Sequence, residues 1–109
     1  MATTEEIIKQ QLRDNAVILY MKGTPDAPQC GFSARAVEAL KKTGVAFASV
    51  NILENPFIRE RLPKISQWPT FPQLFVAGEL VGGSDIVVEM SMNGELAPLL
   101  TAKAGKAAE

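Results

Sequence analysis

The feature that most constrains the fold is a strand–helix–strand pattern in the first half of the chain. Residues 16–21 form an unbroken apolar run, Ala-Val-Ile-Leu-Tyr-Met, which is typical of a strand buried on both faces of a sheet. Apolar residues at helical spacing follow over 32–42, and Gly44 comes just after the basic pair that ends this segment. A second strand is expected over 47–52. Strands joined by a helix pair in parallel through a right-handed crossover, so the sequence predicts an α/β fold.

Signals for further helices and a hairpin flank this unit. Before the helix over 32–42, the pattern predicts a helix over 4–14 with a capping box from Thr3 to Glu6, and a loop over 24–29. After residue 52 it predicts a helix capped by Asn55 and running to Leu62–Pro63 or a little beyond, a hairpin turning at Gly78, a helix after Gly83 and a short helix after Gly94. Residues from about 102 to 109 are expected to fray. Nothing divides the chain, so residues 1–109 are predicted to form one domain.

The composition excludes several classes of protein. The chain has 109 residues, of which 47% are hydrophobic and 21% are charged, and its formal net charge is −1. Its scattered lysines and arginines form no basic face, so no nucleic-acid partner is expected. No apolar run reaches the roughly 18 residues of a membrane span. The acidic start, Met1–Glu6, does not resemble a secretory or transit signal. We therefore predict no membrane partner and a cytoplasmic location.

The chain has one cysteine, Cys30, and no histidine. A lone cysteine excludes an internal disulfide, which fits a reducing cytoplasm, and the lack of histidine removes any Cys–His catalytic pair. Cys30 begins the motif Cys-Gly-Phe-Ser, where a dithiol redox protein would have Cys-x-x-Cys. Ser33 cannot resolve a mixed disulfide, because a hydroxyl is not a thiol equivalent. Cys30 can therefore act as a metal ligand or exchange with an external thiol such as glutathione.

The expected position of Cys30 favours a reactive thiol. Between a strand and a helix, free backbone N–H groups and the positive end of the helix dipole stabilise an anion and lower the pKa of the cysteine. Lys22, at the end of the preceding strand, adds a positive charge. The alternative is that Cys30 is a buried apolar residue, as many free cysteines are. The proline-containing loop before it and the glycine after it favour exposure.

Further segments could bind a ligand, and the residues alone leave each of them open. Pro72 precedes a strand expected inside the sheet, where a cis Phe71–Pro72 bond would present the Phe71 backbone to an extended peptide and a trans bond would form an ordinary turn. The segment Gly82–Asp85 could hold a carboxylate and an ammonium group, or be a plain turn and helix cap. Arg59 could reach a carboxylate or be solvated surface.

Taken together, several blocks of sequence resemble the monothiol glutaredoxins of the Cys-Gly-Phe-Ser class, in their single-domain bacterial type. The blocks span nearly the whole chain and are Tyr20-Met21-Lys22-Gly23-Thr24-Pro25, Cys30-Gly31-Phe32-Ser33, Trp68-Pro69-Thr70-Phe71-Pro72-Gln73 and Gly82-Gly83-Ser84-Asp85. Their order and spacing are specific. The resemblance implies a thioredoxin-like fold, a four-stranded mixed sheet flanked by helices with a cis proline before the third strand.

The resemblance also implies a groove for glutathione beside Cys30. Lys22 and Arg59 would hold the glycyl carboxylate of glutathione. The backbone of Phe71 would pair with its cysteinyl unit.

The γ-glutamyl end of glutathione would be held by Ser84 and Asp85, while Thr70 and Trp68 would line the same groove. Ser84 is also a departure from the family pattern, because many relatives carry a second cysteine at this position. That cysteine can pair with the active-site thiol. A redox switch that relies on this disulfide is therefore lost here.

Members of this class can bind one [2Fe–2S] cluster between two subunits. Such clusters need four soft sulfur ligands, so a homodimer in which each copy supplies Cys30 and one glutathione would complete the set. The leading hypothesis is therefore an iron–sulfur carrier, not an enzyme, that passes its cluster to apo iron–sulfur proteins. The resemblance implies a BolA-type protein as a further partner.

The alternative function is enzymatic. A glutathione-dependent thiol–disulfide oxidoreductase could remove glutathione from protein thiols through Cys30, with free glutathione resolving the intermediate. The extra loop before Cys30 and the generally poor activity of the family in this reaction favour the carrier. A third hypothesis, an interaction module that does not use the thiol, predicts that Cys30 can be replaced without consequence.

Overall fold

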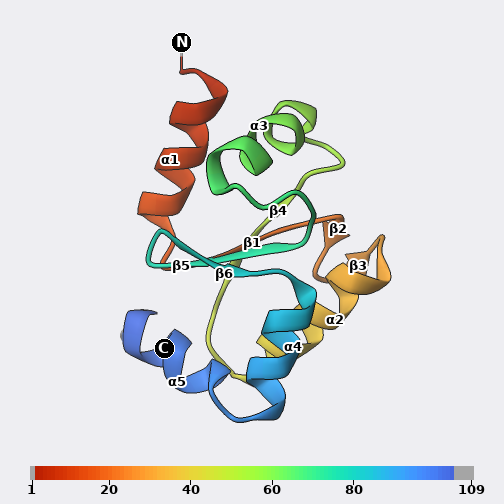
Figure 1. Ribbon diagram of the computed structural model, residues 1–109, viewed down its shortest axis with the longest axis vertical. Coiled ribbons are helices and arrows are strands. Elements are labelled where there is room, and N and C mark those ends of the chain that lie inside the picture. Colours follow the sequence, from red (N-terminus) through yellow and green to blue (C-terminus); the bar gives the residue numbers. More distant parts are fainter. Residues whose placement is uncertain (1, 105–109) are drawn as a thin grey trace.

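Strand β1 (Val17–Met21) lies inside the sheet of the computed structural model, which describes residues 2–104 (Figure 1). It pairs in parallel with β4 (Ala48–Asn51) and antiparallel with β5 (Gln73–Val76), and β5 pairs antiparallel with β6 (Glu79–Gly82). The four-stranded sheet is therefore mixed and has the order β4-β1-β5-β6. The predicted parallel pair, the hairpin and the internal position of the strand after Pro72 are all present.

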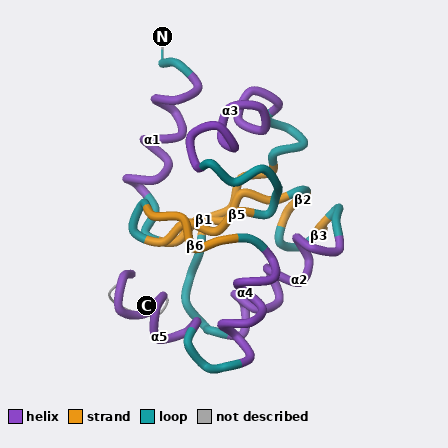
Figure 2. The backbone as a smooth tube through the Cα atoms, in the orientation of Figure 1, coloured by secondary structure: helices purple, strands orange, loops and turns teal. Residues whose placement is uncertain are grey.

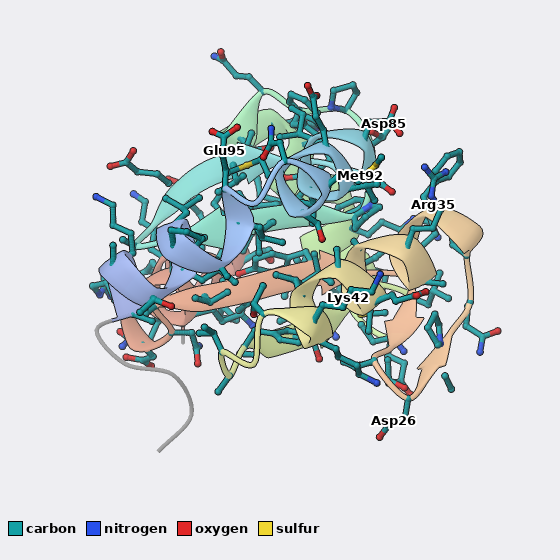
Figure 3. The ribbon with its side chains drawn as sticks, turned by 90° about the horizontal axis from the view of Figure 1, so that it is seen from below. Asp26, Arg35, Lys42, Asp85, Met92 and Glu95 are labelled. Carbon is teal, nitrogen blue, oxygen red and sulfur yellow. The ribbon has the colours of Figure 1, made fainter. Side chains whose placement is uncertain are left out.

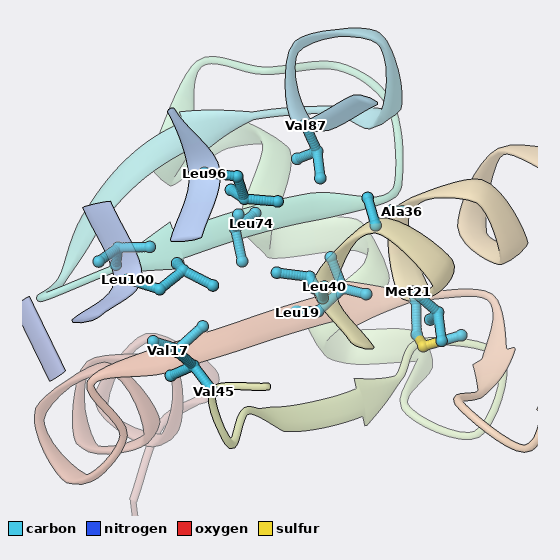
Figure 4. Close-up of a cluster of buried hydrophobic side chains, with 13 residues drawn as sticks. Val17, Leu19, Met21, Ala36, Leu40, Val45, Leu74, Val87, Leu96 and Leu100 are labelled. Atoms are coloured by element: carbon cyan, nitrogen blue, oxygen red, sulfur yellow. The ribbon is translucent and has the colours of Figure 1, made fainter. Parts of the chain in front are cut away.

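Alternate residues of β1 point into two apolar clusters, one on each face of the sheet. Val17, Leu19 and Met21 belong to the first cluster, which Figure 4 shows between the sheet and its helices. Ile18 and Tyr20 belong to the second cluster. Successive side chains of a strand point to opposite faces, so a strand that is apolar at every position must be covered on both sides. This explains the continuous apolar run in the sequence.

Helices cover both faces of the sheet and complete the two clusters. The second cluster lies under α1 (Thr4–Asp14) and α3 (Pro56–Ser66), and the first lies under α2 (Gly31–Lys42), α4 (Ser84–Met92) and α5 (Leu96–Ala104), as Figures 1 and 2 show. No helix within residues 2–104 is long and apolar enough to span a membrane. The architecture is the predicted mixed sheet flanked by helices.

Local signals in the sequence are present where they were expected. At the start of α1 the Glu6 N–H donates to the Thr3 hydroxyl at 3.1 Å, and the Thr3 N–H donates to the Glu6 carboxylate at 2.9 Å, which completes the capping box. The hairpin between β5 and β6 turns at Ala77 and Gly78, both of which have positive φ. The peptide bond before Pro72 is cis, as the resemblance implied.

The segment 24–29, expected as a loop, contains a small hairpin. β2 (Gly23–Thr24) pairs antiparallel with β3 (Ala27–Pro28), and the Ala27 N–H donates to the Thr24 hydroxyl at 3.1 Å. Lys41 of α2 holds the tip, because its ammonium group lies 3.4 Å from the Pro25 carbonyl oxygen. Such short strands carry no recognisable apolar alternation, so the sequence pattern contains no signal for them.

Helix α3 ends at Ser66, a little beyond Pro63, as the sequence pattern allowed. Proline removes one helical hydrogen bond, yet the helix continues to residue 66. Leu62 is fully buried and Ile65 packs on the second cluster, and this tertiary packing offsets the lost bond. Asn55 occupies the cap position as predicted, but its side chain does not cap the helix and instead donates to the Asn51 carbonyl at 2.8 Å.

Helix α5 extends beyond its predicted end. Residues 102–104, expected to fray, belong to the helix. Leu100 is fully buried, and Ala104 packs against the first cluster. A prediction from the small and polar residues of this segment therefore underestimates its order, because tertiary contacts stabilise the helix. Residues 105–109 of the predicted frayed tail lie outside the described residues.

A substitution at Gly23, at the start of the small hairpin, tests how closely the backbone packs in this region. Its φ is 93°, and a Cβ there would lie 2.6 Å from both the Ala27 carbonyl oxygen and the Gln29 nitrogen. Gly23→Ala should lower the free energy of unfolding by more than the roughly 1 kcal/mol that a positive φ alone costs, because the hairpin must also move. Urea unfolding measures the loss.

Gly44→Ala is the matched control for this prediction. Gly44 has a φ of 73°, but a Cβ there would meet no atom within 4 Å. Equal losses in the two variants would contradict the steric account.

Candidate functional site

Cys30 is the N-cap residue of α2, at the end of the helix where the first backbone N–H groups are free. Its backbone is extended, with φ −154° and ψ 136°, and its carbonyl accepts a hydrogen bond from the Ala34 N–H at 2.9 Å. The side chain is partly exposed. The structure therefore places Cys30 at the predicted helix start and excludes the alternative of a buried apolar residue.

The surroundings of Cys30 lower the pKa of its thiol below the usual cysteine value. The backbone N–H of Ser33, in the first turn of α2, contributes most to this shift. Partial burial opposes it, while the Phe32 N–H, the charge of Lys22 and the Ser33 hydroxyl lower the pKa further. Because the thiolate is the form of cysteine that attacks disulfides and binds metals, Cys30 is prepared for either role.

The corner after β1 is fixed by hydrogen bonds on three sides of Lys22. The Lys22 N–H donates to the fully buried Ser33 hydroxyl at 3.1 Å, and its carbonyl accepts from the Gln29 N–H at 2.9 Å. The next amide, of Gly23, donates to Asn51 Oδ1 at 2.9 Å. The main chain at Lys22 is thus held by α2, by the residue before Cys30 and by the end of β4.

A groove of about 740 Å³ opens beside Cys30 at this edge of the sheet. Its walls come from the end of β1 and from α2, α3, α4 and the segment before β5. The site residues predicted from the sequence all line it: Lys22, Cys30, Arg59, Trp68, Thr70, Phe71, Ser84 and Asp85. The fold therefore brings into one groove residues that lie far apart in the chain.

The groove carries cationic and acidic groups on helices from opposite faces of the sheet. Arg59 lies on α3, and Asp85 lies in the first turn of α4, where Figure 3 labels it. Lys22 follows β1. Within residues 2–104 none of the three forms an ion pair, so their charges are available to a ligand. A small molecule with both carboxylate and ammonium groups matches this arrangement.

The start of α4 packs closely against the segment before β5. A Cβ on Gly83 would lie 3.2 Å from Trp68 Nε1 and 3.3 Å from the Pro72 carbonyl oxygen. The absence of a side chain at Gly83 thus lets α4 start against the protein's own chain, while Gly83 also lines the groove. Ser84, next to it, is 6% exposed, and its hydroxyl has no hydrogen-bond partner among the described residues. A buried hydroxyl of this kind is suited to a polar group of a ligand.

Some residues of the site are not recognised from the sequence. Phe32, Pro63 and Ile86 add apolar contacts to the lining. In the sequence, Ser33 is notable only because it is not a cysteine, yet its buried hydroxyl holds Lys22. Gln73 is fully buried and hydrogen-bonds the segment before β5. The available signal was a glutamine at the start of an otherwise apolar strand.

A metal centre at Cys30 needs ligands from outside this chain. Residues 2–104 contain no group of three or more cysteine, histidine or carboxylate side chains that could hold a metal ion. Cys30 is the one thiol of the protein. Any cluster bound there must therefore take its other sulfur ligands from further molecules.

A mixed sheet between helices, with one cysteine at a helix start beside a charged groove, is the architecture of a thiol protein with a single reactive sulfur. The family model for glutaredoxin matches residues 17–81. The chain is 58% identical over 106 residues to glutaredoxin 4 of Escherichia coli (strain K12), covering 97% of this chain and 92% of that protein. The chain therefore belongs to the glutaredoxin family.

Further relatives agree with this assignment and with the monothiol class. The chain is 65% identical over 83 residues to a probable monothiol glutaredoxin of Legionella pneumophila, covering 76% of this chain and 93% of that protein. The solution structure of reduced poplar apo GrxS14 superposes with a TM-score of 0.80 at 44% identity and covers 94% of each chain. The predicted thioredoxin-like fold and the resemblance to monothiol glutaredoxins are thereby confirmed.

The double role of Ser33 can be tested by Ser33→Ala. The partly buried Lys22 N–H would lose its acceptor, so the free energy of unfolding should fall by about 1–2 kcal/mol. The pKa of Cys30 should rise towards its usual value, because one hydrogen bond to the thiolate is lost, so the pH profile of alkylation by iodoacetamide should move to higher pH. Urea unfolding and alkylation rates measure the two effects.

Ser49→Ala, on the exposed side of β4, is the control for Ser33→Ala and should change neither quantity. A Ser33→Ala protein with the wild-type urea midpoint and the wild-type pH profile would show that the hydroxyl fixes neither Lys22 nor Cys30.

Proposed function

We propose that the groove binds glutathione, with the tripeptide's thiol next to Cys30. Glutathione has a glycyl carboxylate, a cysteinyl unit and a γ-glutamyl end that carries both an ammonium group and a carboxylate. The observation that carries the proposal is the chemical match of the groove, where two cations, a thiol with a lowered pKa and an acidic helix start line one cavity. The charged groups of the tripeptide would each have a complementary partner there.

The lining residues suggest how the tripeptide would lie. Lys22 and Arg59 would bind the glycyl carboxylate through charge-assisted hydrogen bonds. Phe71 lies before the ladder of β5, which begins at Gln73, so its backbone would pair with the cysteinyl unit as an added strand. The free N–H groups at the start of α4 and the buried hydroxyl of Ser84 would bind the γ-glutamyl carboxylate. Asp85 would bind the ammonium group.

We further propose that the protein carries a [2Fe–2S] cluster between two copies of the chain. The donor chemistry supports this, because each copy has one thiol, partly exposed and with a lowered pKa, and the cluster needs four. Cys30 of each copy and one glutathione per copy would complete the set. Ligands that are not tethered to the chain can leave readily. This lability suits delivery to apo iron–sulfur proteins.

An exposed aromatic side chain beside Cys30 supports assembly with a partner. Phe32 is 56% exposed although it lines the groove, and exposed aromatic residues are enriched in protein interfaces. It would be covered in a cluster-bridged homodimer, or in a complex in which a BolA-type protein replaces one copy. We place these assemblies in the reducing cytoplasm, where a free thiol persists.

The second candidate function is glutathione-dependent thiol–disulfide exchange, which the lowered pKa of Cys30 favours. The thiolate of Cys30 would attack the glutathione sulfur of a mixed disulfide and release the protein thiol. A second glutathione thiolate would then restore Cys30 and leave as oxidised glutathione. Ser33 forms no disulfide in either step, because it has no thiol; its N–H and hydroxyl act only by lowering the pKa of Cys30. We rank this activity below cluster carriage, as a weak side reaction.

Arg59 provides a direct test of glutathione binding. Arg59→Gln removes a charge that faces the groove, so the affinity of the reduced protein for glutathione should fall about tenfold. Isothermal titration calorimetry measures the change. Arg61→Gln is the matched control, because Arg61 is exposed on the same helix but does not line the groove. Equal losses in the two variants would show that only net charge matters.

Anaerobic reconstitution with iron, sulfide and glutathione tests the cluster. We expect a coloured dimer that needs glutathione and becomes a colourless monomer when glutathione is removed. Cys30→Ser should stay colourless, whereas Ser49→Ala should behave as the wild type. Visible spectra and size-exclusion chromatography give the result. A wild-type protein that stays a colourless monomer under all conditions would leave thiol exchange as the function.

A further inference from the structure

Gln73 is a buried polar side chain in the interior of the sheet. It is fully buried at the start of β5, which lies between β1 and β6, and the rest of that strand, Leu74 to Val76, is buried and apolar. Burying an amide costs free energy unless its hydrogen bonds are replaced. A glutamine at such a position therefore needs a specific partner.

The partners of Gln73 lie in the segment between α3 and β5. Its Nε2 donates to the Trp68 carbonyl at 2.8 Å and to the Thr70 carbonyl at 3.1 Å. Trp68, Thr70 and the two residues after Thr70 line the groove, whereas Gln73 itself does not. Gln73 thus contacts the wall of the groove from behind.

The acceptor half of the same amide makes no comparable contact. Gln73 Oε1 is buried and has no hydrogen-bond partner among the described residues. An unpaired buried acceptor is unfavourable, so an apolar residue would be the cheaper choice if this position served packing alone. The amide is therefore retained for its two donors. Because a primary amide is planar and carries both N–H groups on one atom, it holds the two carbonyls in a fixed relation.

We propose that Gln73 is a positioning residue that sets the affinity of the groove for glutathione by fixing the segment 68–71. This inference rests on the proposed glutathione function. The Phe71 backbone, which would pair with the cysteinyl unit, lies directly after Thr70, and this segment lies outside the strands of the sheet. With Gln73 in place the segment is already ordered before the ligand arrives, and a preorganised site loses less entropy on binding. Without the two donors, binding itself must order the segment.

Two substitutions separate the donors from the volume of the side chain. Gln73→Glu keeps the shape but removes the Nε2 donors, and Gln73→Met removes the whole polar group. Both proteins should bind glutathione about tenfold more weakly than the wild type in calorimetry. The pH profile of Cys30 alkylation should be unchanged in both, because the groups that lower the pKa of Cys30 lie on α2 and at Lys22.

A control variant distinguishes positioning from general loss of stability. Leu100→Ala removes a fully buried side chain of the first cluster, on α5 and away from the groove. It should lower the urea midpoint and leave the affinity for glutathione unchanged. If folded Gln73→Glu and Gln73→Met proteins bind as tightly as the wild type, the positioning role is overturned while the proposed function stands. A wild-type protein that binds no glutathione overturns the proposed function and the inference together.

A measurement on the wild type keeps the inference testable if neither variant folds. If the fixed segment improves glutathione binding, bound glutathione must in turn stabilise the hydrogen bonds of Gln73, since coupling between two sites is reciprocal. Hydrogen exchange of the Gln73 side-chain amide, followed by NMR, should therefore slow when glutathione is added at saturation. The exposed side-chain amide of Gln10 on α1 is the control and should not respond. Exchange at Gln73 that is unaffected by bound glutathione would refute the coupling.

Discussion

Burial of β1 on both faces is the constraint on which the rest of the structure depends. Its side chains enter both apolar clusters, so helices must cover the sheet on each side. The register then determines the edge of the sheet at which the site lies. Met21 is opposite Asn51 of β4, and Tyr20 is opposite Gln73 of β5. The end of β1, the end of β4 and the start of β5 consequently meet at the same edge, next to the start of α2.

Polar side chains at that edge hydrogen-bond the irregular segments that lie outside the sheet. Asn51 accepts from the Gly23 N–H, Ser33 accepts from the Lys22 N–H, and Gln73 donates to the carbonyls before β5. Each pairs a main-chain N–H or C=O that lies outside the four-stranded sheet. None of the three is expected to react. Their common effect is that the chain around Cys30 and the groove wall are held by hydrogen bonds within the protein itself, as in a preorganised site.

The sequence predicts most of this structure where local signals are strong. The apolar run, the capping box of α1 and the start of α2 at Cys30 are local patterns, and each has its predicted place. The predictions were wrong where tertiary packing overrides local preference. Leu100 and Ala104 pack on the first cluster and keep α5 ordered where residues 102–104 were expected to fray. The supporting roles of Ser33 and Gln73 were also not predicted, because they depend on partners distant in the chain or on a turn whose shape is not encoded locally.

The sequence by itself determined the chemistry: one thiol, no second cysteine to resolve it, and a set of charged and aromatic residues with the spacing of a monothiol glutaredoxin. Residue types fix which reactions are possible, and they can be read without coordinates. Only the tertiary structure decided that Lys22, Arg59 and Asp85, which lie just after β1, on α3 and on α4, line one groove with Cys30. It also decided which buried polar groups hydrogen-bond the chain segments around that groove. Both depend on strand register and helix packing, which arise from contacts between residues far apart in the chain.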